Sequence, residues 1–166
     1  MKIFGIAGFS GSGKTTLIER IIPQLTARKL KVAVIKHIHH DFDMDRPGKD
    51  SWRAREAGAA TVLLASDHRT ALLTEHRDTP PTLGDLLAKL PPCDLVLVEG
   101  YKREAIPKLE VHRAETDKPW LFSDDPHILA VASDVAAPNN FPRIDIDAIP
   151  LITNLIVNHA LSYPTA

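Results

Sequence analysis

Short apolar runs alternate with longer amphipathic stretches along most of the chain. The apolar runs predict strands at residues 2–7, 31–36, 61–65, 70–74, 95–98, 108–112 and 128–132. The amphipathic stretches predict one helix that starts at Thr16 and three more at residues 50–58, 82–90 and 147–160. Strands interleaved with helices are typical of an α/β layer structure with a mainly parallel sheet.

Two prolines interrupt these helical patterns. The first helix has one apolar face, made of Leu17, Ile18, Ile21, Ile22 and Leu25. Pro23 lies within it and predicts a kink or a local break, because proline removes a helical hydrogen bond. Pro150 predicts a similar interruption near the start of the last helix.

The length of 166 residues predicts one domain that can bury a proper core. We place this domain at residues 1–160 and expect residues 161–166 to form a frayed tail. The hydrophobic content of 44% and the charged content of 25% are ordinary for a globular protein in water.

Charge and composition narrow the class of protein further. A formal net charge of −1 argues against a general nucleic-acid binder, which is normally basic. No apolar run approaches the roughly 18 residues of a membrane helix, so we expect no membrane partner. The beginning of the chain does not have the pattern of a signal peptide, and the single cysteine, Cys93, fits a reducing compartment. The expected location is therefore the cytoplasm.

The stretch GFSGSGKTT, residues 8–16, matches the glycine-rich P-loop pattern between a predicted strand and a predicted helix. Its glycines allow a tight turn whose backbone N–H groups and following helix N-terminus attract phosphate. Lys14 is expected to reach the β and γ phosphates, and the Thr15 hydroxyl is expected to bind Mg²⁺. The pattern therefore predicts a P-loop NTPase-like three-layer α/β fold with a mainly parallel central sheet.

The segment DLVLVEG places a carboxylate at each end of one predicted strand. Because ligands bind beyond the carboxyl ends of parallel strands, Glu99 is on the P-loop side and Asp94 is on the opposite side. Four apolar residues followed by an acid have the form of a Walker B element. We therefore predict that Glu99, and not Asp94, binds Mg²⁺ directly or through a water; the alternative is a surface acid.

Histidine and aspartate are concentrated in residues 36–51, KHIHHDFDMDRPGKDS, after the second strand. Three interpretations stay open: a zinc site, a solvated polar loop, or the rim of an active site. The rim is favoured because titratable groups beside a phosphate site are often functional. Asp41 is then the first candidate for a water-mediated contact with Mg²⁺, and Lys49 and Arg53 are candidates for binding an anionic partner.

Together these motifs resemble the molybdopterin-guanine dinucleotide biosynthesis adaptor proteins, the MobB family. The segments that carry the resemblance are GFSGSGKTTL, VAVIKHIHHDFDMDRPGKDS, REAGAATVLLAS, RTALLTE, DLVLVEGYK and ILAVASD. Tyr101 departs mildly from the phenylalanine expected after Val-Glu-Gly.

The resemblance implies a GTP-binding protein with weak GTPase activity, often a homodimer. Such a protein assists the guanylyltransferase that joins GMP to molybdopterin. The phosphates would be held by Gly11, Ser12, Gly13, Lys14, Thr15 and Thr16, and the metal by Thr15 and Glu99, with Lys14, Glu99 and Asp41 serving GTP hydrolysis.

Guanine selection is carried by the resemblance, because the chain has no Asn-Lys-x-Asp motif. Asp134 follows a predicted strand at the correct edge and can accept hydrogen bonds from guanine N1–H and the exocyclic amine. A strand-ending turn explains Asp134 equally well.

A different class of function also stays open. A small-molecule kinase could use the same P-loop, with its substrate bound at the loop from His37 to Ser51. A kinase usually carries an arginine-rich lid, whereas the arginines here are scattered, which favours the adaptor.

Overall fold

The computed structural model describes residues 1–38 and 43–164. The predicted apolar runs form strands in it. In this part of the chain, seven strands build one sheet in the order β2-β5-β1-β6-β7-β8, with β9 beside β1. All neighbours are parallel except β1 and β9. The strands are β1 (Lys2–Ala7), β2 (Val32–Lys36), β5 (Leu95–Glu99), β6 (Lys108–His112), β7 (Ile128–Ser133), β8 (Arg143–Asp145) and β9 (Leu161–Ser162).

The contacts divide the chain into two compact units, and the single domain over residues 1–160 stays a prediction. The first unit contains the large sheet and consists of Met1–His37 and Leu87–Ala166. The second unit is Ile38–Leu86.

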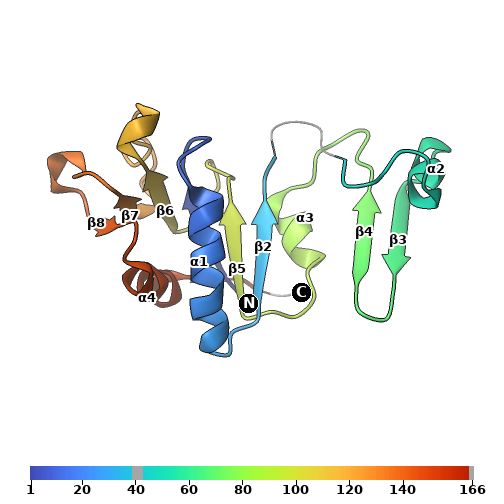
Figure 1. Ribbon diagram of the computed structural model, residues 1–166, viewed down its shortest axis with the longest axis horizontal. Coiled ribbons are helices and arrows are strands. Elements are labelled where there is room, and N and C mark those ends of the chain that lie inside the picture. Colours follow the sequence, from blue (N-terminus) through green and yellow to red (C-terminus); the bar gives the residue numbers. More distant parts are fainter. Residues whose placement is uncertain (39–42, 165–166) are drawn as a thin grey trace. The chain divides into compact units, whose positions relative to one another are not determined.

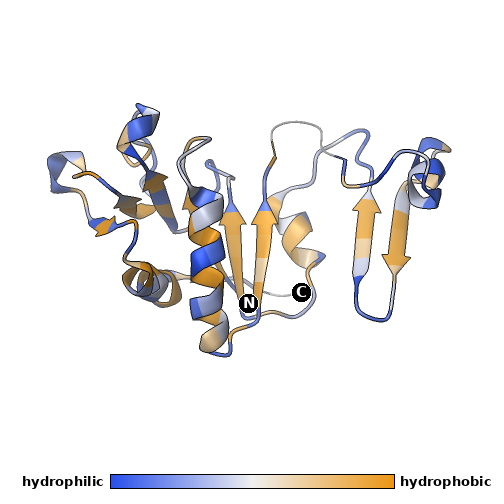
Figure 2. Ribbon diagram, in the orientation of Figure 1, coloured by the Kyte–Doolittle hydropathy of each residue, from blue (hydrophilic) through white to orange (hydrophobic). Residues whose placement is uncertain are grey.

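One face of the large sheet is covered by α1 (Lys14–Ala27) and α4 (Ile149–His159). Both helices lie against the sheet in Figure 1, and Figure 2 shows apolar positions alternating with polar ones along α1. The joint core contains Phe4, Ile6, Leu97, Leu109, Ile21 and Ile152, all fully buried. Buried strands of a parallel sheet have nearly continuous apolar sequences, which explains why the central strands do not alternate apolar and polar residues.

Both prolines have a different effect from the one predicted. The helix α1 continues through Pro23, so the expected break is wrong. Pro23 is exposed while Ile21 and Leu25 are fully buried, and their burial outweighs the one missing hydrogen bond. Pro150 lies in the first turn of α4, where proline has no helical partner to lose, so it begins the helix instead of interrupting it.

The sequence predicted a frayed tail at residues 161–166, but residues 161 and 162 are ordered in a strand. They form β9, which pairs with Ile3 and Lys2 of β1 in antiparallel register. The Tyr163 N–H then donates to the Met1 carbonyl over 2.9 Å. The described end of the chain is therefore fixed at the edge of the sheet where β1 begins.

Three polar side chains on β6 are buried and hold the following loop against the sheet. Lys108 forms a 2.8 Å ion pair with Asp125. Glu110 accepts hydrogen bonds from the backbone N–H groups of Leu121 and Phe122 at 2.9 and 3.0 Å. His112 stacks on Trp120 with 3.6 Å between ring centroids. Partnered polar groups can be buried at small cost, so this face of β6 can hold polar side chains under the loop.

The second unit holds a hairpin and a short helix. The strands β3 (Thr61–Ala65) and β4 (Thr70–Thr74) pair in antiparallel register around the predicted turn. The helix α2 (Asp50–Glu56) precedes them. Its Arg55 contacts Asp43 at 2.9 Å and Glu75 at 2.9 Å, which joins the loop before the helix to the hairpin.

The remaining elements are short. The helix α3 spans Leu83–Ala88, shorter than the predicted 82–90, and Thr82 caps it by accepting the Asp85 N–H at 3.2 Å. Two 3-10 turns occupy Ala114–Thr116 and Pro138–Asn140. Over the ranges 1–38 and 43–164, none of the helices has the length and apolar character needed to cross a membrane.

We predict that the contact between α4 and the sheet is a main source of stability. Replacing the fully buried Ile152 with alanine leaves a cavity and should lower the free energy of unfolding by about 2–5 kcal/mol. The adjacent Leu151 is 60% exposed, so Leu151→Ala should change it by less than about 0.5 kcal/mol. Urea denaturation of both variants measures the difference, and equal effects would contradict the packing described.

Candidate nucleotide-binding site

Three strands bring the P-loop and Glu99 to one edge of the large sheet. The parallel register places Glu99 of β5 opposite Ile6 of β1 and opposite Lys36 of β2. The P-loop leaves the carboxyl end of β1 one residue later. The loop, the predicted Walker B acid and the end of β2 therefore meet where a parallel sheet binds its ligands.

Glycines give the P-loop its turn. Gly11 and Gly13 have φ values of +83° and +91°, a region that favours glycine. A Cβ on Gly13 would lie 3.2 Å from Nε of Arg113, so this glycine also allows a close approach by a cation. A Cβ on Gly11 would meet no atom of the described residues within 4 Å, so the turn leaves open space there.

Lys14 begins α1 and points back over the loop. Its Nζ donates a 2.8 Å hydrogen bond to the Phe9 carbonyl. Burial lowers the pKa of Lys14; Glu99 opposes this shift, while the ammonium groups of Lys102 and Lys36 add to it. A lysine held among other cations is a favourable partner for an anion.

The predicted magnesium pair, Thr15 and Glu99, converges on one cation. Nζ of Lys36 lies 3.2 Å from the Thr15 hydroxyl oxygen and 3.3 Å from a carboxylate oxygen of Glu99. Mg²⁺ prefers such hard oxygen ligands, and both oxygens already reach a common positive group. The donor set therefore fits Mg²⁺, which when bound would neutralise phosphate charge and orient the phosphates.

Asp94 lies at the opposite end of β5. Its carboxylate accepts the Lys31 N–H at 2.7 Å, and its carbonyl accepts the Lys2 N–H at 2.9 Å. These contacts join the amino ends of three neighbouring strands. The assignment of Glu99 rather than Asp94 to the metal stays a prediction, with the geometry in its favour.

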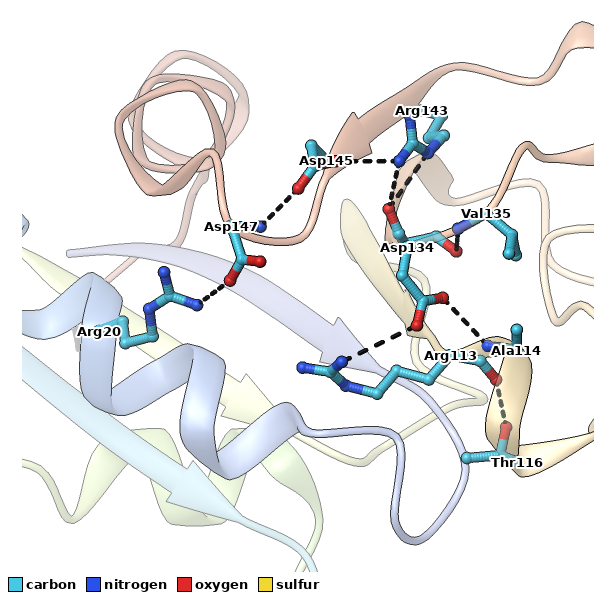
Figure 3. Close-up of polar contacts among 10 residues, drawn as sticks. Arg20, Arg113, Ala114, Thr116, Asp134, Val135, Arg143, Asp145 and Asp147 are labelled. Atoms are coloured by element: carbon cyan, nitrogen blue, oxygen red, sulfur yellow. Dashed lines mark hydrogen bonds and ion pairs between the residues drawn. The ribbon is translucent and has the colours of Figure 1, made fainter.

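Asp134 also lies at the edge of the P-loop, after β7, and its carboxylate already has partners. One oxygen accepts the Ala114 N–H at 3.0 Å, and the other lies 3.8 Å from a guanidinium nitrogen of Arg113 (Figure 3). The first contact holds the turn at Ala114–Thr116, so Asp134 has a structural partner, and the strand-ending alternative stays open. The second oxygen faces the cation nearest Gly13, so base recognition by Asp134 stays a prediction.

Sequence reasoning assigned no role to Lys36, Lys102 or Arg113. Lys102 lies over the Phe9 ring, with its Nζ 4.2 Å from the ring centroid. Lys36 and Arg113 could have been found only from their place in the sheet. Lys36 ends β2, which neighbours β5, and Arg113 follows β6, which neighbours β1. Their place depends on the strand order, which local sequence patterns do not determine.

Part of the histidine-aspartate loop lies outside the described residues. His39, His40 and Asp41 are in this part, so the role of Asp41 stays a prediction. Asp43 and Asp45 are described and interact with Arg55 at 2.9 and 3.5 Å. In the ranges 1–38 and 43–164 there is no group of three or more histidine, cysteine, aspartate or glutamate side chains arranged for a metal.

Comparison with known proteins identifies the family. The model of the family described as molybdopterin guanine dinucleotide synthesis protein B, MobB, matches residues 3–134. The chain belongs to this family. A curated relative from Haemophilus influenzae, named molybdopterin-guanine dinucleotide biosynthesis adapter protein, is 49% identical over 94% of this chain and 88% of its own length. The relative of the same name from Escherichia coli is 40% identical over 93% and 91%.

Solved MobB structures have the same fold. A crystal structure of molybdopterin-guanine biosynthesis protein B has a TM-score of 0.72, with 29% identity over 94% of this chain and 98% of that chain. Bacillus subtilis MobB has a TM-score of 0.76 at 24% identity, covering 98% and 100%, which shows the likeness of fold alone. The predicted P-loop NTPase-like α/β fold with a mainly parallel sheet and flanking helices is confirmed.

The two ends of β5 give a matched pair of variants. We predict that Glu99→Gln reduces Mg²⁺-dependent GTP hydrolysis at least about tenfold, because it removes a charged oxygen ligand. Asp94→Asn should leave hydrolysis unchanged, since its contacts lie at the other end of the strand. Phosphate release measured with both variants tests the assignment, and a larger loss in Asp94→Asn would reverse it.

Proposed function

We propose that this MobB protein binds GTP with Mg²⁺ at its P-loop and hydrolyses it slowly. The observation that carries this proposal is the convergence of Lys14, Thr15 and Glu99 at one edge of the sheet. The backbone from Gly11 to Thr16 would bind the phosphates, with Lys14 on the β and γ phosphates. Thr15 and Glu99 would hold the metal, with Asp41 contacting it through water.

The positive groups around the loop support a triphosphate as the ligand. Lys36, Lys102 and Arg113 surround Lys14 and the P-loop, in addition to the helix N-terminus. A triphosphate carries several negative charges and would be attracted by this arrangement. Guanine as the base is supported by the family, with Asp134 as its proposed acceptor.

We propose that the protein serves as an adaptor for the guanylyltransferase that joins GMP to molybdopterin. The relatives from Haemophilus influenzae and Escherichia coli are named as adapters of this biosynthesis. An adaptor of this kind needs a nucleotide site and a surface for its partner, rather than a pocket that encloses the whole substrate. Slow hydrolysis would then limit how long the two proteins stay engaged.

Lys14→Ala should abolish tight GTP binding while the protein stays folded. Loss of a charge-assisted hydrogen bond at such a site costs about 2–5 kcal/mol, which corresponds to at least about thirtyfold in affinity. Lys31→Ala is the control, because it removes the same charge at the opposite end of β2. Calorimetric titration with GTP measures both, and an unchanged dissociation constant for Lys14→Ala would remove the P-loop from the proposal.

The adaptor role is tested by reconstitution. Molybdopterin, Mg-GTP and the guanylyltransferase form dinucleotide cofactor at a rate that wild-type protein should raise and Lys14→Ala should not. Equal stimulation by the two proteins would separate the adaptor role from nucleotide binding. Phosphate transfer from GTP to a small acceptor, with no effect on cofactor formation, would support the kinase instead.

We also propose that the protein forms a homodimer, with the hairpin β3–β4 contributing to the contact. Leu63 and Leu72 are paired across the two strands and are 65% and 52% exposed. An isolated two-stranded hairpin is marginally stable in water, so these leucines favour an additional cover.

Light scattering should give wild-type protein twice the 18.3 kDa mass of one chain. Leu63→Asp should shift the protein toward the single-chain mass, because it buries a charge in the proposed contact. Leu151→Asp, at an exposed leucine of α4, is the matched control. A single-chain mass for wild-type protein at micromolar concentration would rule out the dimer.

A further inference from the structure

Lys36 lies where the proposed metal would bind. Its ammonium is 3.2 Å from the Thr15 hydroxyl oxygen and 3.3 Å from the Glu99 carboxylate, the two groups assigned to Mg²⁺. We propose that Lys36 is the resident cation of the magnesium site in the nucleotide-free protein, and that Mg²⁺ enters only when Lys36 leaves. This inference rests on the proposed Mg-GTP site and adds a positioning residue to it.

The fold explains why a lysine is found there. The strand β2 neighbours β5 in parallel register, and Lys36 is the residue paired with Glu99. The Glu99 side chain is only 8% exposed. A buried carboxylate without a positive partner is strongly unfavourable, so a nearby cation stabilises it while the metal is absent.

The other lysines at this edge are engaged with the P-loop itself. Lys14 donates to the Phe9 carbonyl, and Lys102 lies over the Phe9 ring. Lys36 is the lysine that bridges the two oxygens. It joins the Thr15 hydroxyl and the Glu99 carboxylate, the two groups assigned to the metal.

Lys36 and Mg²⁺ cannot bridge these oxygens together. Mg²⁺ binds oxygen at about 2.0–2.1 Å in a nearly octahedral shell, which leaves no space for an ammonium between the same two ligands. The Lys36 side chain is 47% exposed and has a flexible four-carbon stem. It can therefore leave the site without movement of β2.

This exchange would make metal binding depend on the nucleotide. Free Mg²⁺ must displace Lys36 with only water to receive the released ammonium. Mg²⁺ that arrives with a triphosphate also supplies phosphate oxygens, which give the released ammonium a new partner. Lys36 would thus disfavour metal without nucleotide and favour the two together.

The first test measures metal binding to nucleotide-free protein, with Mn²⁺ as a spectroscopic substitute for Mg²⁺. Titration followed by electron paramagnetic resonance should show Lys36→Met binding Mn²⁺ at least about tenfold more tightly than wild type, because a competing charge is gone. Lys102→Met also removes a charge beside Lys14 but does not bridge the two oxygens, and should change the affinity less than about threefold. Equal effects of the two variants would overturn the proposal.

A double variant locates the metal. Adding Glu99→Gln to Lys36→Met should remove the gain in affinity, and a gain that persists would place the metal elsewhere and overturn the proposal. Lys36→Gln repeats the test if Lys36→Met does not fold, as judged by thermal melting.

The last test uses wild-type protein only. Acetylation of Lys36, followed by mass spectrometry, should become several-fold faster when Mg²⁺ saturates the nucleotide-free site, while acetylation of Lys102 stays the same. Unchanged reactivity of Lys36 at saturation would overturn the exchange. These assays contain no GTP, so they can fail while GTP binding holds, and GTP binding can fail while they succeed.

Discussion

The buried carboxylate of Glu99 is the constraint on which this site depends. It lies at the end of a strand whose other residues, Leu95 to Val98, are buried and apolar, so little water reaches its carboxylate. The protein must supply a cation there, and the parallel register places Lys36 directly opposite. The same register brings Glu99 beside the end of β1, from which the P-loop departs. One buried charge therefore joins the strand order, the phosphate loop and the metal chemistry.

The remaining structure holds this edge in place. The helices α1 and α4 cover one face of the sheet, and α1 thereby fixes the position of Lys14 and Thr15 at its N-terminus. On β6, partnered polar side chains hold the loop that carries Arg113 close to Gly13. Asp94 and β9 tie the opposite edge together. The described site residues Lys14, Thr15, Lys36 and Glu99 thus lie on helices and strands of the large sheet's unit.

The sequence predicted the parts of the fold that local patterns control. The strand β1 and the hairpin strands have the predicted bounds, and the P-loop lies between β1 and α1 as its motif requires. Pro23 and Pro150 were misread because a local pattern does not show whether burial holds a helix through a proline, or whether a proline begins a helix. The pairing of Leu161–Ser162 with β1 was missed because a two-residue strand has no periodicity to detect. Lys36 and Arg113 were missed because their place beside the site follows from the strand order, which local sequence patterns do not determine.

This member of the MobB family is proposed to bind GTP with Mg²⁺ at the edge of the sheet that carries Glu99. Calorimetric titration of the wild-type protein with GTP and with ATP, each with and without Mg²⁺, tests it most directly. GTP should bind more tightly than ATP, and Mg²⁺ should strengthen GTP binding. No detectable binding of either nucleotide in the presence of Mg²⁺ would contradict it.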